Sequence, residues 1–304
     1  MQIRKFIYKT GLLFLLIGFC IGLFEFSLQI IPNDYTFKHN YLHQNGKKIQ
    51  VLFMGNSHVY RGVKAENIDR EAFNASYISQ SLDVDLIILN KHLNKLPSLE
   101  LVVLNFSYQS LYNSVKVGKE YWRVKNYNLY YNLQLSSNLE DYSEILSQSF
   151  TKNLRRLKTE YLIKENLVFS SEKGSGLLEG HENLKATAKK AVKRHTDKGV
   201  PGYHETIKKE LNDIIRILEE RQIKVILVTP PASEYYNELL DTIQTNRSEK
   251  FLKMLAANNS NVFYYNFLKD KDFEIEDFYD ADHLNEKGAL KYTSKLNNIL
   301  NEEI

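Results

Sequence analysis

The sequence predicts an α/β protein in which helices cover a parallel sheet. Four short runs are almost wholly apolar and rich in β-forming residues, which is typical of strands buried on both faces of a parallel sheet. Segments with apolar residues at helical spacing lie between these runs, and the alternation predicts a doubly wound sheet. The chain has 304 residues, of which 43% are hydrophobic and 25% charged, and these values are ordinary for a globular protein.

The chain begins with a segment that is long and apolar enough to cross a bilayer, residues 11–32. Arg4, Lys5 and Lys9 precede it, so the positive-inside rule predicts a cytoplasmic N-terminus and an extracytoplasmic chain after residue 32. No small-residue cleavage site follows, and we therefore expect an uncleaved signal anchor in the cell membrane. We expect its one acid, Glu25, near the outer interface, where a carboxylate costs less than at the midplane.

The elements of the sheet and its helices can be placed from these patterns. The predicted strands span residues 49–54, 99–104, 224–229 and 261–267. The predicted helices span residues 84–96, 204–221 and 285–300.

The domain organisation follows from the segment that breaks the alternation. Residues from about 110 to 202 are aromatic and polar at first and basic later, which predicts a helical insertion that caps the crevice of the sheet. We therefore expect a cytoplasmic terminus and membrane anchor over residues 1–32. Residues 33–304 are expected to form one extracytoplasmic domain that carries the cap.

A serine follows the first predicted strand in the turn Gly55-Asn56-Ser57-His58. Ligands of open α/β sheets bind beyond the carboxyl ends of the strands, which is where this turn falls. A serine in such a turn is exposed, and its own backbone N–H can point at a bound oxyanion. Ser57 is therefore the candidate nucleophile.

A base for this serine is found far along the chain. A serine hydroxyl is a poor nucleophile and needs a partner that accepts its proton. Asp280 and His283 lie three residues apart, so one turn can bring the carboxylate to the imidazole, where it fixes the tautomer and stabilises the imidazolium. Asp282 is the alternative partner of His283, or an N-terminal cap of the helix that follows.

Together, Gly55-Asn56-Ser57-His58 and Asp280-x-x-His283-Leu284-Asn285 resemble the first and last blocks of SGNH/GDSL-type hydrolases, with Asn56 in place of the usual Asp. The resemblance covers residues 49–110 and 222–304. It implies a flavodoxin-like α/β/α sandwich and a catalytic set of Ser57, His283 and Asp280. With the anchor and the insertion, the chain looks like the cell-envelope branch, whose members serve polysaccharide or teichoic-acid acylation.

The middle blocks of that family, a Gly and an Asn that supply further oxyanion donors, are matched only loosely. Residues 74–81 occupy the place of the Gly block and contain no Gly. Ser79 is the best match there, since a backbone N–H needs no particular side chain. Asn105 matches the Asn block, because its side-chain amide can donate to an oxyanion; Ser107 and Gln109 are its rivals.

Composition excludes several other classes of site. The net charge of +3 is close to neutral for a chain of this size, whereas a nucleic-acid-binding domain usually carries a strong basic stripe. We therefore expect no nucleic-acid partner. Cys20 is the only cysteine, which excludes an intrachain disulfide and a Cys-rich zinc site. The other histidines, His92, His181, His195 and His204 among them, show no metal-ligand spacing, and we expect neither a metal nor a cofactor.

The sequence therefore predicts a serine esterase or O-acyltransferase that works through an acyl-serine intermediate. On the resemblance, its expected partners are an acylated or acyl-accepting glycan of the cell envelope, the membrane that holds the N-terminal helix, and a membrane acyltransferase. The alternative is a catalytically idle fold that binds glycan or serves assembly in a surface-polymer machine, for which the missing Gly block is the best support.

Overall fold

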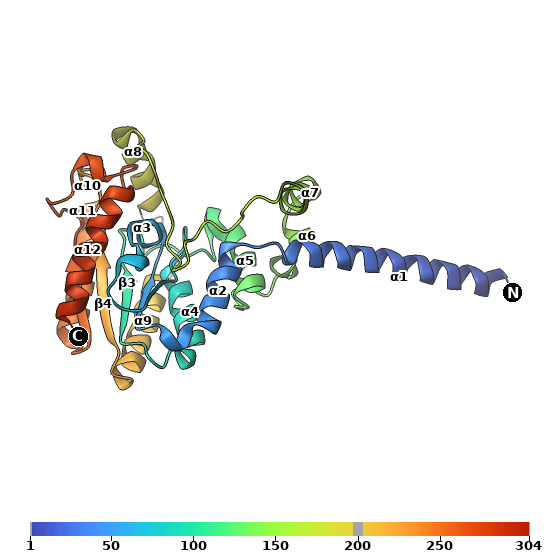
Figure 1. The fold of residues 1–304 in the computed structure, drawn as a ribbon, viewed down its shortest axis with the longest axis horizontal. Helices are drawn as coiled ribbons and strands as arrows, with labels where there is room; N and C mark the ends of the chain where they lie inside the picture. The colour runs from blue at the N-terminus through green and yellow to red at the C-terminus, as the bar shows by residue number, and fades with distance from the viewer. Residues whose placement is uncertain (1, 197–202, 304) are drawn as a thin grey trace. The chain divides into compact units, whose positions relative to one another are not determined.

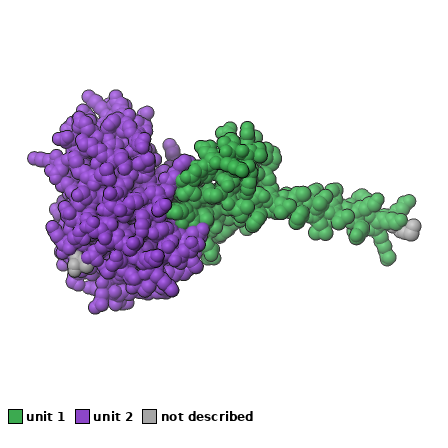
Figure 2. All heavy atoms as spheres, viewed as in Figure 1, with its two compact units in different colours: residues 1–37, 122–168 green, residues 38–121, 169–304 purple. Residues whose placement is uncertain are grey.

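The computed structural model describes residues 2–196 and 203–303 (Figure 1). Within them the chain forms two compact units, each made of two stretches of sequence (Figure 2). Unit 1 comprises the N-terminal residues up to 37 together with residues 122–168. Unit 2 comprises residues 38–121 and the chain from residue 169 onward.

Unit 2 is built on a five-stranded parallel sheet with the strand order β2-β1-β3-β4-β5. This is the order of flavodoxin-like folds, so the predicted α/β fold class is confirmed. In the register of the sheet, Val51 lies opposite Leu101, and Leu101 lies opposite Lys224. The strands are β1 (Val51–Met54), β2 (Ala72–Asn74), β3 (Leu101–Asn105), β4 (Lys224–Thr229) and β5 (Val262–Asn266).

The four predicted strands are confirmed as β1, β3, β4 and β5, with ends that differ by at most two residues. The edge strand β2 was not predicted, because three residues are too few to show a periodic pattern. The three predicted helices are confirmed as α4, α9 and α12, although a short 3₁₀ turn completes the segment after α4.

Helices cover both faces of the sheet (Figure 1). On one face, the buried side chains of Phe53 and Val103 pack with Val59 of α3 and with Tyr292 and Leu296 of α12. On the other face, α4 and α9 pack against each other. The helices are α3 (Ser57–Gly62), α4 (Leu82–His92), α8 (Leu184–His195), α9 (Tyr203–Glu220), α10 (Glu234–Asn237), α11 (Thr242–Asn258) and α12 (Glu286–Glu302).

Unit 1 contains the N-terminal helix and part of the predicted insertion. Its helices are α1 (Gln2–Gln29), α5 (Val124–Tyr130), α6 (Glu144–Ser147) and α7 (Phe150–Lys158), and α2 (Asp34–Gln44) begins in it. The helix α1 is long and apolar enough to cross a membrane. Its 28 residues have a length of about 42 Å, which exceeds the roughly 30 Å of a hydrocarbon core.

The predicted insertion of residues 110–202 is helical but divided between the units. Residues 122–168 belong to unit 1, whereas α8 belongs to unit 2 and packs there on α10. Residues 197–202, the predicted end of the insertion, lie outside the described residues. That the insertion acts as a cap stays a prediction.

Candidate active site

The turn that carries Ser57 is fixed by its neighbours on both sides. Gly55 follows β1 with φ 138°, a conformation that L side chains rarely adopt, and a Cβ atom there would lie 2.4 Å from Cβ of Asn105. Asn56 caps α3, because its side-chain oxygen accepts from the backbone N–H of His58 at 3.0 Å. Ser57 is the first residue of α3, and its N–H has no hydrogen-bond partner among the described residues.

The loop that carries Asp280 and His283 is closed at its base. Phe278 and Leu284 form an antiparallel bridge, and the N–H of Tyr279 donates to the carbonyl of His283 at 2.9 Å. Asp280 Oδ1 accepts from the backbone N–H of His283, also at 2.9 Å. Asn285 then begins α12 by accepting from the N–H of Gly288, so the loop leads directly into a capped helix.

The fold brings Ser57, His283 and Asp280 into one hydrogen-bonded chain. Ser57 Oγ lies 2.8 Å from His283 Nε2, although the two residues are 226 positions apart. On the other side of the ring, His283 Nδ1 lies 2.9 Å from Oδ1 and 3.0 Å from Oδ2 of Asp280. This is the spacing that a nucleophile, its base and the orienting carboxylate require.

A second carboxylate lies beside the first. Asp282 is 2% exposed, and its Oδ2 is 3.0 Å from His58 Nε2, while its Oδ1 is 3.8 Å from His283 Nδ1. The rings of His58 and His283 stack with centroids 4.8 Å apart. His195 lies next to this group, with Nδ1 3.9 Å from Asp282 Oδ2. A buried carboxylate thus faces three histidines.

These contacts set the charge states at the site. Burial alone would lower the pKa of His283, but the carboxylates of Asp282 and Asp280 raise it above its ordinary value. Burial alone would raise the pKa of Asp282, but His283, His58 and His195 hold it far below its usual range. Burial lowers the pKa of His58, and it lowers that of His195 to about 3, despite the nearby Asp282. The group therefore carries an anionic Asp282 and neutral His58 and His195 at neutral pH.

Of the two further residues predicted at the site, Asn105 lies in a buried network. Its Nδ2 donates to Asn56 Oδ1 and to Ser107 Oγ, both at 2.9 Å. Ser107 Oγ is in turn 2.6 Å from His58 Nδ1. The amide hydrogens of Asn105 are thus engaged with the ends of β1 and β3. Donation to an oxyanion would require Asn105 to give up one of these bonds.

Ser79 occupies a turn that suits a glycine. The N–H of Gln80 donates to the carbonyl of Tyr77 at 3.1 Å, which puts Ser79 at the third position of the turn with φ 57°. A left-handed third position favours Gly, since other residues are strained there. In the described part of the chain, the N–H of Ser79 makes no hydrogen bond. Its role as an oxyanion donor stays a prediction.

Sequence reasoning named Asp282 only as an alternative partner of His283 and did not connect it with His195. The signal for Asp282 was its place in the same block as His283. No signal could have found His195, because it lies on α8 and reaches the site only through the packing of α8 on α10.

One group within the described residues has ligand atoms close enough to share a metal ion, namely His58, Asp282 and His283. These atoms lie within 4.8 Å of one another. However, His58 Nε2 already bonds to Asp282, and His283 Nδ1 bonds to Asp280. An ion would have to compete with the bond between His58 and Asp282 and with one of the two ring-nitrogen bonds of His283, so the arrangement fits proton transfer better than metal binding. The expectation of no metal stays a prediction.

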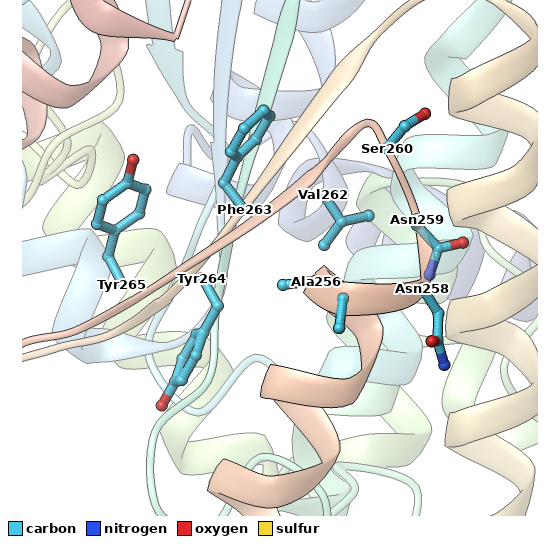
Figure 3. Close-up of a pocket in the computed structure, with 9 residues that line it drawn as sticks. Ala256, Asn258, Asn259, Ser260, Val262, Phe263, Tyr264 and Tyr265 are labelled. Atoms are coloured by element: carbon cyan, nitrogen blue, oxygen red, sulfur yellow. The ribbon is translucent and has the colours of Figure 1, made fainter.

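A surface hollow lies elsewhere, beside the edge strand β5 (Figure 3). It is lined by residues 256–260 and 262–265, and none of the predicted site residues is among them. Phe263 and Tyr265 point to one side of the strand and Tyr264 to the other (Figure 3). The candidate site therefore rests on the hydrogen-bonded cluster beyond β1 and β3, and not on this hollow.

Comparison with known proteins gives similarity in structure only. No family model and no curated protein matches the sequence. A GDSL-like lipase from Bacteroides thetaiotaomicron aligns with 89% of this chain and 100% of its own, at 12% identity and a TM-score of 0.43.

Two further structures are similar to the same degree. A Bacteroides fragilis protein assigned as an acylhydrolase aligns with 86% of this chain and 94% of its own, at 12% identity and a TM-score of 0.41. A Streptococcus pneumoniae protein described as a platelet activating factor aligns with 94% of this chain and 99% of its own, at 12% identity and a TM-score of 0.42. At these scores the likeness carries no argument about chemistry. The fold class rests on the strand order of the sheet, and the site rests on its own geometry.

Proposed function

We propose that the chain is a membrane-anchored serine hydrolase or O-acyltransferase of the SGNH/GDSL type. The observation that carries the proposal is the hydrogen-bonded chain from Ser57 Oγ through His283 to Asp280. The match of the two terminal sequence blocks to that family supports it, as does the flavodoxin-like strand order.

The geometry supports covalent catalysis in two half-reactions. Ser57 Oγ attacks the carbonyl carbon of an ester while His283 Nε2 accepts the hydroxyl proton. Asp280 accepts the Nδ1–H hydrogen bond, which fixes the tautomer and stabilises the imidazolium. The tetrahedral intermediate expels the alcohol, to which His283 returns the proton, and an acyl-Ser57 remains.

The acyl group then passes to a second hydroxyl. Water or a sugar hydroxyl attacks the acyl carbonyl, His283 accepts its proton, and Ser57 leaves and recovers that proton. The unbonded N–H groups of Ser57 and Ser79 are the proposed donors to the oxyanion in both steps. Water gives hydrolysis and a glycan hydroxyl gives acyl transfer.

Asp282 acts as a positioning residue in this scheme. It holds His58 against the ring of His283, and its negative charge lies 3.8 Å from His283 Nδ1. The imidazolium that forms during attack is therefore flanked by two carboxylates, those of Asp280 and Asp282.

The substrate we propose is an acyl ester of a cell-envelope glycan, on the extracytoplasmic side of the membrane that α1 crosses. The length and composition of α1 support the anchor, and Arg4, Lys5 and Lys9 before it support this orientation. A membrane acyltransferase is the proposed partner that would supply the acyl group if the reaction is transfer.

The test uses the full-length chain in detergent. We would measure release of 4-nitrophenol from its acetate, and covalent labelling by a fluorophosphonate, for the wild type and for Ser57→Ala and His283→Ala. Both variants should lose at least about 10³-fold in the serine-dependent rate, because members of such a set act as a unit. Ser260→Ala, at an exposed serine, is the matched control and should keep full activity.

The outcome separates the classes of function. Wild-type labelling that Ser57→Ala abolishes establishes the nucleophile. Equal turnover in folded wild type, Ser57→Ala and His283→Ala would overturn the catalytic proposal and leave a catalytically idle, glycan-binding fold. With an active protein, formation of an acylated sugar in place of free acid when a glycan is added distinguishes transfer from hydrolysis.

A further inference from the structure

Unit 1 exposes a group of large apolar side chains on one short stretch of chain. They lie on α6, on α7 and on the single π-helical turn that follows, Thr159–Ile163. Phe150 is 66% exposed and Leu162 is 77% exposed. Exposed apolar groups of this kind mark a contact with a partner or a membrane. We call this set the apolar face; its members are Leu146, Phe150, Leu154, Tyr161, Leu162 and Ile163.

The same stretch of chain is attached to the end of α1. The carboxylate of Glu25 accepts from Ser143 Oγ and from the backbone N–H groups of Glu144 and Ile145, at 2.7 to 2.9 Å. These N–H groups open α6, where a helix terminus favours a negative charge. Glu25, the one acid of the apolar N-terminal segment, thus has a full set of donors.

Two contacts of the apolar face itself join it to α1. The ring of Phe150 packs on the ring of Phe24 with centroids 5.7 Å apart. The hydroxyl of Tyr161 donates to the carbonyl of Ser27 at 3.2 Å. Because α1 ends at Gln29, all these contacts fall within its last two turns.

The length of α1 places these turns at the boundary of the bilayer. A span needs about 20 residues, and counting that number back from Gln29 reaches Thr10, directly after Lys9. A span with Lys9 at one boundary therefore has residues 24–29 at the other. The apolar face contacts α1 at that level, so it lies at the depth of the lipid headgroups and the first acyl carbons.

The direction and charge of α7 suit the same location. In Figure 1, α7 is seen nearly end-on while α1 runs along the page, so α7 lies across the direction of α1. A helix in the membrane plane beside a spanning helix has this arrangement. The exposed side chains of Lys152, Arg155 and Lys158 add positive charge, which anionic headgroups attract.

The apolar face is also held rigidly from within unit 1. Glu144, fully buried, accepts from Lys125 Nζ at 2.7 Å and from Arg156 at 2.5 Å, and also from the hydroxyl of Tyr130. Asn153 on the inner side of α7 donates to the carbonyl of Glu144 at 3.0 Å. These bonds pair the buried carboxylate of Glu144 and tie α7 to α6, the two helices that carry part of the apolar face.

From these contacts we propose that the apolar face lies in the interfacial layer of the bilayer that α1 crosses, with anionic lipid as its partner. The inference rests on α1 being a membrane span, which is part of the proposed function. It adds a second membrane contact within unit 1, beside α1, and it assigns Glu25 to joining the two.

Depth-dependent fluorescence quenching tests this in the full-length chain. In a Cys20→Ser background, an environment-sensitive nitrobenzoxadiazole (NBD) dye is attached after Leu154→Cys or Leu162→Cys on the apolar face. Leu16→Cys in the middle of α1 reports the span. Leu290→Cys, at an exposed leucine of α12 in unit 2, is the matched control. The protein is placed in vesicles of phosphatidylcholine and phosphatidylglycerol that contain lipids spin-labelled near the top or near the bottom of the acyl chain.

We expect blue-shifted emission from both dyes on the apolar face, and stronger quenching by the shallow label than by the deep one. The dye at Leu16 should be quenched more by the deep label, and the dye at Leu290 by neither. If the dyes on the face behave like that at Leu290 while the dye at Leu16 is quenched, the inference is wrong and the anchor stands. If the emission of the dye at Leu16 also shows an aqueous environment, the proposal that α1 crosses the membrane is itself wrong. A third outcome would be blue-shifted emission from the dyes on the apolar face that appears only at high protein concentration and is not quenched by either lipid label. It would show that a second copy of the chain covers the face, and it would overturn the inference.

Discussion

Gly55→Ala tests whether the turn before Ser57 is built as the structure shows. Two penalties add at this position. A non-glycine residue at φ 138° carries backbone strain of about 1–3 kcal/mol. The new Cβ would also lie 2.4 Å from Cβ of Asn105, and forcing atoms into a packed core costs about 1–3 kcal/mol. The expected loss of stability is therefore about 4 kcal/mol.

Thermal unfolding followed by circular dichroism measures this loss. For a unit of this size, about 2–4 °C of melting temperature is lost per kcal/mol, so Gly55→Ala should lower it by roughly 8–16 °C. Gly180→Ala is the matched control, because Gly180 has φ 87° and open space around the position of its Cβ. It should carry only the strain, about 2 kcal/mol.

The difference between the two variants isolates the collision with Asn105. Equal melting temperatures for Gly55→Ala and Gly180→Ala would refute the close approach of β1 and β3 at the nucleophile. Gly55→Ala should also label with a fluorophosphonate about 10²-fold more slowly, since a displacement near 1 Å of Ser57 from His283 costs about that much.

The site and unit 1 lead to four further predictions. His283 must be neutral to act as a base, and its pKa is raised above the ordinary value, so kcat/KM should rise with pH through a pKa above that value. Asp282→Asn removes one of the charges that raise this pKa, and the rising limb of the pH–rate profile should move to lower pH. Ser79→Gly should relieve left-handed strain and raise the free energy of unfolding by about 0.5–1 kcal/mol in denaturant titrations. Glu144→Gln leaves the buried Lys125 and the half-buried Arg156 without their carboxylate and should destabilise unit 1 by about 3 kcal/mol, measured as faster proteolysis within residues 122–168.

The parallel sheet could be predicted because its strands are buried on both faces. Runs such as that over residues 224–229 carry no polar side chain at their centre, and this pattern needs no knowledge of the partner strands. The strand β2 could not be predicted, because its three residues are too few to show a periodic pattern of apolar side chains. The division of residues 110–202 between the units could not be foreseen either, since it depends on contacts between α1 and α7 that no local pattern records.

The proximity of Asp280 to His283 could be predicted from their spacing, because it is a local matter of one turn. The 2.8 Å distance between Ser57 Oγ and His283 Nε2 depends on the sheet and on α12, which bring the two distant residues together. In the sequence, only the order of the two blocks indicated that they would meet. The engagement of Asn105 with Asn56 and Ser107 could not be predicted, because an amide at a strand end looks the same in a sequence whether it is bonded or free.

The wide separation of Ser57 and His283 has a consequence for synthesis. The nucleophile leaves the ribosome 226 residues before the base, and α12, which packs against the α3 helix of the nucleophile, follows later still. On the proposed function, a nascent chain held in the membrane by α1 would thus carry an unactivated serine until α12 has been synthesised. Esterase activity should consequently appear only with completed chains, and a chain stopped before Asp280 should stay in the membrane as an inert protein.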